Sequence, residues 1–474
     1  MTNLLRFLLV LVFTAVSGQV LAQGTSGAVV GSVVDDKNEP VISAVVQAYQ
    51  GGILKGGAAT DFDGNFVIKP LAPGRYDLTV KYIGYKESKT VGVIVSVDQN
   101  TEVKTKLQPS TTLDEVVIID YKVPLINKYE GGSTTTKTSD QLEQMATRNT
   151  TTMVSTSAGA YSQTDGGAVS IGGGRADGTL YIIDGVQVYG SRGINVSQGS
   201  IDQIQVITSG IPAKYGDAIG GVVTITTKGV SEKLRGSVLL EKSVDGYGHN
   251  LGNFTLSGPL LRKYTDSTHT NKKPIVGFFL AGDAWYDKDR SPEYHGNYAV
   301  KDEVLQNLRD NPLIGVPNQS GVPVFRNRAE TVTGKDLYLT KAKQNAQVFE
   351  GRLTGRLDFQ LSDELNLSAG GTFNYSKSKI YNRSWSYFSI DEIPDEYNYT
   401  GRGFIRLQQS FKKKNNLTNA NGEEKQEKSL ISNAFYTLQV DYQTDYRKIE
   451  DPNHKKNVFN YGYVGKFNTE YTPI

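Results

Sequence analysis

A strict period-two alternation in the C-terminal half constrains this chain most. In "FEGRLTGRLDFQL", residues 349–361, apolar or small residues alternate with polar ones. Successive side chains of a β-strand point to opposite faces, so this segment presents one apolar and one polar face. The pattern returns in "LNLSAGGTFNY", residues 365–375, and in "AFYTLQVDY", residues 434–442. These segments predict antiparallel strands joined by short turns such as "SDE".

Alternating strands of this length are typical of transmembrane β-barrels, whose outer face contacts lipid and whose inner face is polar. A soluble sandwich facing its own core is the alternative. The N-terminal "MTNLLRFLLVLVFTAVSGQVLAQ" favours the membrane, because Arg6, a short apolar stretch and small residues before Gln23 form a secretory signal. A retained anchor is disfavoured because the apolar stretch is too short to span a bilayer. We predict a signal peptide over residues 1–22.

The composition excludes several classes of function. A net charge of +2 argues against a nucleic-acid partner, and the absence of Cys excludes disulfides. The 4 His show no metal-ligand spacing, and no nucleophile motif or acid–base pair stands out. We therefore expect no enzyme, no cofactor, and no catalytic or metal-binding residues. The mean hydropathy of −0.37 is compatible with a membrane barrel, because only alternate residues of its strands are apolar.

Residues 27–107 read as strands separated by the turns "DDKNEP", "DFDGN" and "LAPGRY", which predicts a small β-sandwich. A calcium loop is the alternative for "DFDGN", but its glycine and its twelfth residue, Ala72, do not fit an EF-hand. We predict a hairpin turn at Asp63-Gly64. The order of "GSVVDDKNEPVISAVV", "TDFDGNFVI" and "LAPGRYDLTVKYIGYKE" resembles the carboxypeptidase-regulatory-like domain. That transthyretin-like module precedes the functional unit of many outer-membrane receptors of Bacteroidota, and the resemblance implies regulation or docking rather than catalysis.

The next segment is dense in Gly, Ser and Thr. Its "SIGGGRADGTLYIIDGVQVYG" and "IDQIQVITSGIPAKYGDAIGGVVTITTK" resemble the plug domain of TonB-dependent receptors. A phosphate-binding loop is the alternative for "GGGRADG", but neither glycine-rich phosphate motif fits. The sequence departs from the family's Ile-Arg-Gly, since Gly172 follows Ile171 and the arginine is displaced. The candidate plug residues are Arg175, Asp184, Gly185, Gly210, Pro212, Tyr215, Gly216, Gly220 and Gly221.

Between sandwich and plug lies "STTLDEVVIIDYK", residues 110–122, whose four consecutive branched aliphatics favour a strand. A free strand on a linker suits β-augmentation, in which it joins the sheet edge of a partner. The stretch resembles the TonB box of Bacteroidota receptors, which implies binding of TonB. The alternative is that the strand packs on the sandwich or on the plug. The residues matched to the box are Leu113, Asp114, Glu115, Val116, Val117, Ile118 and Ile119.

Together these segments predict a mainly β chain with an N-terminal β-sandwich, a plug domain and the N-terminal part of a transmembrane antiparallel β-barrel. We expect a signal peptide at 1–22, the sandwich at 23–108, a linker with the Ton box at 109–122, the plug at 123–230 and a partial barrel at 231–474. The residues from Arg235 onward provide about eight to ten strands, whereas plugged transporters have about 22. We therefore expect the chain to be the N-terminal part of a longer receptor.

The resemblance implies an outer-membrane importer, powered by the inner-membrane TonB complex through the Ton box. The N-terminal domain and Ton box would be periplasmic, and long insertions at 287–343 and 397–427 would face outward. A non-transporting scaffold in a larger outer-membrane assembly and a surface adhesin are the alternatives. Besides TonB and outer-membrane lipid, a surface lipoprotein or other envelope proteins are candidate partners. Siderophores, cobalamin, peptides and oligosaccharides all stay open as ligands.

Overall fold

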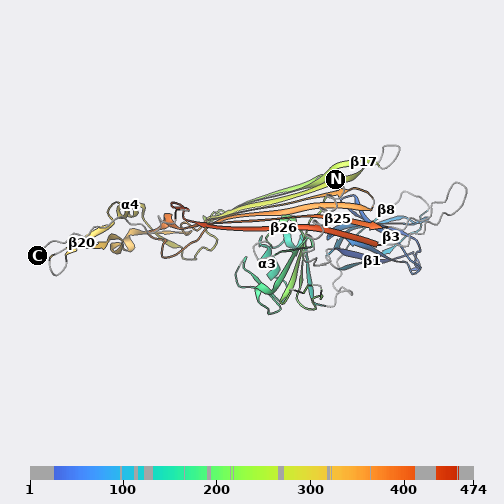
Figure 1. Cartoon of the computed structure of the whole chain (residues 1–474), viewed down its shortest axis with the longest axis horizontal. Coiled ribbons are helices and arrows are strands. Elements are labelled where there is room, and N and C mark those ends of the chain that lie inside the picture. Colours follow the sequence, from blue (N-terminus) through green and yellow to red (C-terminus); the bar gives the residue numbers. More distant parts are fainter. Residues whose placement is uncertain are drawn as a thin grey trace, which may run out of the picture.

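The computed structural model describes residues 26–96, 99–110, 116–121, 132–164, 166–188, 194–213, 215–216, 218–264, 272–317, 321, 323–362, 364–411, 434–455 and 457. It consists mainly of β-strands in three bodies: a sandwich, a plug and a large antiparallel sheet (Figure 1). The predicted signal peptide lies outside the described residues. Within the described part of the chain, no helix is long and apolar enough to cross a membrane.

The sandwich forms from the predicted strand–turn repeats. Its sheets have the orders β4-β1-β7 and β3-β2-β5-β6-β8, and their facing side chains form one apolar core that includes Tyr76 and Leu78. At the predicted "DFDGN" turn, the Asp61 carboxylate accepts hydrogen bonds from the backbone N–H groups of Asp63 and Asn65, and Gly64 has φ +74°. A tight turn with a positive φ at Gly64 forms as predicted, but the predicted hairpin is wrong, because the strands on either side, β3 and β4, belong to different sheets. The strands are β1 (Gly27–Val34), β2 (Val45–Gln50), β3 (Ile53–Ala59), β4 (Asn65–Leu71), β5 (Gly74–Lys81), β6 (Glu87–Val95), β7 (Asn100–Lys106) and β8 (Val116–Asp120).

The plug is built on a mixed sheet of order β13-β12-β15-β14-β9. Its two central strands consist of fully buried residues, and apolar side chains on both faces of the sheet form two clusters within the plug. The elements are β9 (Thr134–Thr138), α2 (Ser139–Glu143), α3 (Thr150–Ser155), β10 (Ala160–Ser162), β11 (Val169–Ile171), η1 (Ala176–Gly178), β12 (Thr179–Ile183), β13 (Val186–Val188), η3 (Gln198–Ser200), β14 (Ile201–Ile207) and β15 (Gly221–Thr227).

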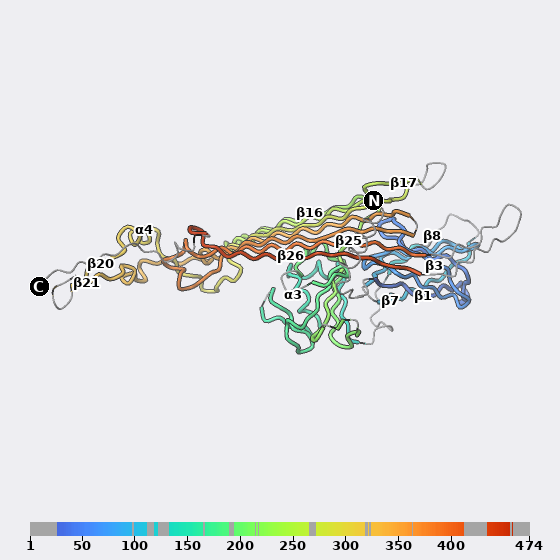
Figure 2. Tube along the Cα trace, viewed as in Figure 1, coloured from blue at the N-terminus to red at the C-terminus, as the bar shows by residue number. Residues whose placement is uncertain are grey.

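The third body, which we call the wall, is an antiparallel meander of order β16-β17-β18-β23-β24-β25-β26. Its neighbours along the sheet are also neighbours along the chain, apart from the small strands inserted between β18 and β23. Figure 2 shows the wall as long parallel traces, with the plug against one face and the sandwich at one end. The strands are β16 (Arg235–Lys242), β17 (Asn250–Tyr264), β18 (Lys272–Asp287), β23 (Val348–Gln360), β24 (Leu365–Lys379), β25 (Asp395–Phe411) and β26 (Ala434–Glu450).

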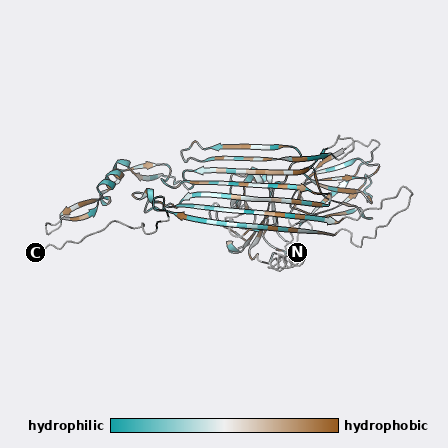
Figure 3. Cartoon of the chain, turned by 45° about the horizontal axis from the view of Figure 1, so that its top comes forward, coloured by the Kyte–Doolittle hydropathy of each residue, from teal (hydrophilic) through white to brown (hydrophobic). Residues whose placement is uncertain are grey.

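The two faces of the wall follow the predicted alternation. Hydrophobic and hydrophilic residues alternate along its strands in Figure 3. In β23, Leu353 and Leu357 are exposed, whereas Arg352 and Arg356 are buried on the face that the plug and sandwich cover. The polar face is thus the inner face of a barrel wall, and the apolar face is the one that lipid would cover.

Two aromatic rows border the apolar face. Near one end, the rings of Phe349, Tyr375, Tyr399 and Tyr446 follow one another across four adjacent strands, with centroids 6.0, 5.1 and 6.0 Å apart. At the other end, Phe411 lies 6.1 Å from Tyr436. Along β25 the two rows are separated by about 40 Å of strand, or about 30 Å normal to a bilayer at the usual tilt. This spacing matches the aromatic girdles of a membrane-spanning barrel.

The segment between β18 and β23 extends beyond the wall at the end away from the sandwich (Figure 1). The prediction that this insertion faces outward concerns its orientation in the membrane and stays a prediction. The second insertion, predicted outward at 397–427, was placed wrongly: residues 397–411 belong to β25, and the ends of the connection at Phe411 and Ala434 lie beside the sandwich. The alternation in β25 is weakened by Gly401 and Gly403 on the apolar face and by Phe404 on the polar face, which hid the strand. The inserted elements are β19 (Asn297–Val300), α4 (Asp302–Asp310), β20 (Leu313–Pro317), β21 (Pro323–Asn327), η4 (Arg328–Thr331), η5 (Gly334–Asp336) and β22 (Leu337–Thr340); η6 (Ile390–Glu392) follows β24.

Candidate functional site

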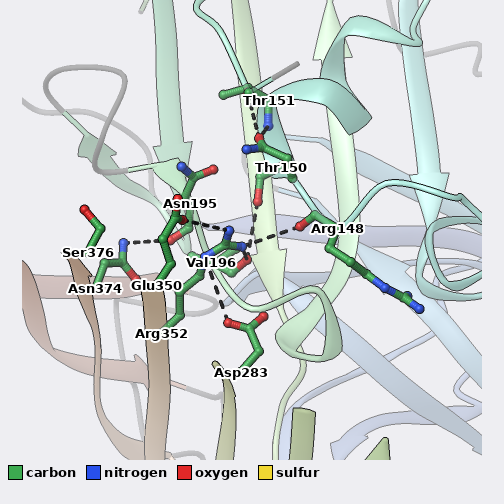
Figure 4. Close-up of polar contacts among 12 residues, drawn as sticks. Arg148, Thr150, Thr151, Asn195, Val196, Asp283, Glu350, Arg352, Asn374 and Ser376 are labelled. Carbon is green, nitrogen blue, oxygen red and sulfur yellow. Dashed lines mark hydrogen bonds and ion pairs between the residues drawn. The ribbon is translucent and has the colours of Figure 1, made fainter. Parts of the chain in front are cut away.

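Arg352 of β23 joins the wall to the plug (Figure 4). Its side chain is only 2% exposed, and Nη1 donates hydrogen bonds to the backbone carbonyls of Val196 (3.0 Å) and Arg148 (3.5 Å). Both carbonyls belong to loops that lead into short helices of the plug, outside its sheet. A wall cation therefore donates to two carbonyls of the plug, of which that of Val196 also accepts a hydrogen bond from the hydroxyl of Thr150 (3.3 Å).

Other wall groups hold Arg352 in position. The carboxylates of Glu350 and Asp283 lie 3.7 and 3.9 Å from guanidinium nitrogens, and the guanidinium carbon lies 4.1 Å from the centre of the Trp285 ring. A buried ion costs several kcal/mol unless other groups compensate its charge. Both carboxylates and the ring come from the wall, so the cation is positioned whether or not the plug contacts it.

The predicted Asp184-Gly185 turn makes a second contact with the wall. Asp184 and Gly185 have φ +51° and +81°, and the Asp184 carboxylate accepts hydrogen bonds from the backbone N (2.8 Å) and hydroxyl (2.7 Å) of Thr227. These bonds fix the turn so that the carbonyl of Asp184 accepts a hydrogen bond from the buried guanidinium of Arg406 in β25. Again the wall supplies the arginine and the plug supplies a backbone acceptor.

The remaining plug–wall contacts described here are also polar. Asn374 donates to the carbonyl of Asn195 (2.7 Å), and Arg148 forms an ion pair with Glu241 (2.6 Å). A cavity of about 340 Å³ between the two bodies is lined mostly by polar side chains, including Asp283, together with Leu239 and Leu251 of the wall. Because the apolar clusters lie inside the plug, the plug can leave the wall without exposing its own core.

Apart from Asp184 and Gly185, the predicted plug residues lie where the 209–221 loop meets the 172–178 loop. The carbonyl of Gly178 accepts hydrogen bonds from the N–H groups of Ile219 (3.1 Å) and Gly220 (3.0 Å). A Cβ on Gly221 would lie 2.4 Å from the Ile171 side chain, so only glycine fits there. Gly210 has φ +65°, and the 209–221 loop carries Pro212, buried Tyr215 and Gly216.

Arg175, the displaced plug arginine, is exposed and is the N-cap residue of the short helix η1. Its carbonyl accepts a hydrogen bond from the N–H of Gly178 (3.0 Å). Among the described residues, no contact joins its side chain to the wall. The structure therefore separates Arg175 from the arginines that hold the plug.

The sandwich is also attached to the wall. Lys55 of β3 lies 3.4 Å from the Asp358 carboxylate, with the two side chains 7% and 0% exposed. Burial lowers the pKa of Lys55, while Asp358 opposes that shift. Asp358 is also paired with Arg356 (3.0 Å), and Gln408 donates to the carbonyl of Pro70 (2.7 Å). The sandwich thus covers the end of the inner face near the 361–364 turn.

The sandwich and the plug contact each other directly. Arg75 forms an ion pair with Asp202 of β14 (3.2 Å), and Gln203 donates to the hydroxyl of Ser96 (2.7 Å). Burial raises the pKa of Asp202, and the guanidinium of Arg75 acts in the opposite direction. Both plug residues are buried, so sandwich and plug form a continuous polar interface.

The predicted Ton-box strand is a strand, and it is not free. Val116–Asp120 forms β8, which pairs in parallel with β6 in the register Ser88 with Val117 and Lys89 with Ile118. The structure therefore takes the alternative in which the strand packs on the sandwich. Leu113, Asp114 and Glu115 lie outside the described residues, and of Val116 and Val117 only the backbone is described.

The residues that connect the three bodies were not identified from the sequence. The sequence places Arg352, Arg356 and Asp358 on the polar face of a strand, where a barrel interior would expect any polar residue. Arginines repeated every fourth residue, at 352 and 356 and again at 402 and 406, are the signal that marks contact with another polar surface rather than with water. Among the described residues, no group of three or more His, Asp or Glu side chains is arranged to hold a metal ion.

Fold and site together define a barrel wall whose inner face holds a separately folded plug. The family model described as carboxypeptidase regulatory-like domain matches residues 28–108, and that described as TonB-dependent receptor plug domain matches residues 128–222. The chain thus contains the two domain types named in these models, and the relatives below carry the name of TonB-dependent receptors and transporters. The class consists of outer-membrane proteins, and the relatives are receptors and transporters rather than enzymes.

The TonB-dependent transporter Oar of Myxococcus xanthus is 28% identical over 277 residues, which cover 50% of this chain and 26% of Oar. TonB-dependent receptor P26 of Formosa agariphila is 31% identical over 205 residues, covering 40% of this chain and 20% of P26. The Formosa relative agrees with the Bacteroidota type expected from the sequence. The chain spans about a quarter or less of the length of the curated relatives it matches.

Among solved structures, a G324V mutant of the ferric enterobactin receptor from Pseudomonas aeruginosa is similar at 16% identity and a TM-score of 0.36. The match covers 68% of this chain and 46% of that chain.

Proposed function

We propose that this protein imports a ligand across the outer membrane, and that TonB supplies the energy by pulling on the Ton box. The observation that carries the proposal is how the plug is held. The described contacts with the wall are polar, and they include the bonds made by Arg352, Arg406 and Asn374 and the ion pair of Arg148 with Glu241. The apolar clusters of the plug consist of its own residues. Such contacts can break and form again as the plug moves.

The proposed orientation follows from the attachments of the wall. The end that carries the sandwich and β8 faces the periplasm, where TonB is accessible, and the segment between β18 and β23 faces the outside. In this orientation the two aromatic rows lie at the two interfaces of the membrane. The ends of β25 and β26 at Phe411 and Ala434 then face the periplasm.

The proposed partners are TonB and outer-membrane lipid. A surface lipoprotein or another envelope protein, docked on the outward segment, is a further predicted partner. We propose no catalysis, no cofactor and no nucleic-acid partner, in keeping with relatives that are named as receptors and transporters.

Binding of the cognate TonB C-terminal domain to a peptide of residues 111–122 tests the proposal. We expect the native peptide to bind, and a Val117→Pro peptide to bind at least tenfold more weakly, because proline removes a donor from the strand ladder. Isothermal titration calorimetry measures both. Failure of the native peptide to bind would contradict energisation by TonB and favour the scaffold function.

A further inference from the structure

β8 is fastened to the sandwich at both ends. Before it, the N–H of Ser110 donates to the carbonyl of Gly84 (3.0 Å), and Pro109 forms an isolated bridge with Tyr85. After it, the N–H of Tyr121 donates to the carbonyl of Val91 (2.9 Å). β8 is therefore a strand of the sandwich sheet rather than a part of the linker.

Tyr121 anchors the C-terminal end of β8. Its ring packs against the sandwich core, and its hydroxyl donates to the carbonyl of Glu102 in β7 (3.4 Å). Burial beside the Glu102 carboxylate raises the pKa of Tyr121 to about 12. One side chain thus connects β8 to both sheets of the sandwich.

The outer edge of β8 is open in the described structure, because β8 is the last strand of the order β3-β2-β5-β6-β8. Ile118 and Ile119, which point to opposite faces, are 68% and 42% exposed. Figure 2 places β8 at the end of the molecule opposite to β20 and β21. An exposed aliphatic edge strand is a template for pairing with a strand of another chain.

We propose that TonB binds β8 in place, adding a sixth strand to the sandwich sheet, so that the pull is delivered to the sandwich as a whole. This inference rests on the proposed function and specifies how its partner is bound. A strand held in extended form avoids the ordering cost that a flexible linker would pay on binding. The occupant is an extended strand of TonB, because the edge offers backbone donors and acceptors flanked by branched aliphatic side chains.

If TonB binds β8 in place, its pull must break the contacts that attach the sandwich to the rest of the molecule. The sandwich is attached to the wall through Lys55 and Asp358 and to the plug through Arg75 and Asp202. A force on β8 therefore loads the contacts of the sandwich with the wall and with β14 of the plug. The sandwich then acts as a second closure that leaves the inner face before the plug does.

A disulfide between β6 and β8 can distinguish binding of TonB to β8 in place from binding that requires β8 to leave the sandwich sheet first. The chain has no Cys, so a Lys89→Cys/Ile118→Cys variant contains one possible disulfide, between residues that are directly paired. Paired strands bring Cα atoms within the range that a disulfide bridges. Lys89 loses only a surface ion pair with Asp77, which contributes little to stability.

The experiment measures the affinity of the TonB C-terminal domain for the oxidised and the reduced forms of this variant of the full chain. We expect the two affinities to agree within about threefold. Loss of binding on oxidation, at least tenfold and recovered on reduction, would overturn the inference while leaving TonB as the partner. Absence of binding in both forms, together with failure of the peptide of residues 111–122, would instead overturn the proposed function.

A Tyr121→Ala variant gives an independent test, because the two mechanisms predict opposite signs. Under binding in place, loss of the anchor disorders β8 and weakens TonB binding several-fold. Under detachment, the same change would release the strand and tighten binding. Tyr121→Phe is the matched control, since it keeps the packed ring and removes only the 3.4 Å hydrogen bond; we expect it to bind like the native chain. A thermal melt verifies that the sandwich is folded in each variant.

Discussion

At the scale of single residues, the plug is held by arginines of the wall that donate to carbonyls of the plug. Arg352 and Arg406 are buried, and each reaches a plug carbonyl outside the plug's central strands. Of the plug's own arginines, Arg148 forms an ion pair with Glu241 of the wall, whereas Arg175 has no described side-chain contact with the wall.

The substitution Arg352→Gln should weaken the attachment of the plug to the wall. The shorter amide cannot reach the carbonyls of Val196 and Arg148, and Asp283 loses its cation. Removing one member of a buried ionic group costs about 3–5 kcal/mol. We expect at least tenfold faster amide exchange in the 194–200 segment of the folded protein. Arg175→Gln is the matched control and should leave exchange unchanged; equal effects of the two substitutions would argue against the wall arginine as the holder.

At the scale of elements, the contact between β3 and β23 is asymmetric. Asp358 has three described partners, Lys55, Arg356 and Ser368, so it stays compensated when one is removed. Lys55 is buried with a lowered pKa and depends on Asp358 alone for an opposite charge. Removing Asp358 should therefore destabilise the docked sandwich more than removing Lys55, although the two residues form one ion pair.

Lys55→Met should be nearly neutral for docking of the sandwich, within about 1 kcal/mol, because it removes a desolvated cation and keeps its apolar stem. Asp358→Asn should cost about 3–5 kcal/mol, because it leaves two buried cations without a carboxylate. Limited proteolysis of the connection between sandwich and plug, with increasing urea, measures the difference. A larger effect of Lys55→Met than of Asp358→Asn would contradict this account.

Elements that depend on local backbone geometry could be predicted from the sequence, whereas contacts between distant segments could not. The alternation in 349–361 predicted both the strand and its two faces, because strand geometry alone assigns each side chain to a face. The Asp184-Gly185 turn was predicted for the same local reason. The pairing of β8 with β6 was not favoured, because a short aliphatic strand fits many sheet edges. The contact of Arg352 with Val196 joins residues 156 apart in sequence and depends on where the plug docks, which no local pattern encodes.

At the scale of the whole molecule, the sandwich and the β18–β23 segment lie at opposite ends of the wall, so a barrel in the membrane separates them into two compartments (Figure 1). Tyr294 in the segment between β18 and β23 is 95% exposed, and Ile83 in the turn between β5 and β6 is 94% exposed. Because these 474 residues contain no Cys, a single Cys at either position is a distinct label site within them. We expect a membrane-impermeant maleimide to label Tyr294→Cys in intact cells, and Ile83→Cys only after the outer membrane is permeabilised. The reverse pattern would invert the proposed orientation, and labelling of both in intact cells would contradict a membrane-spanning wall.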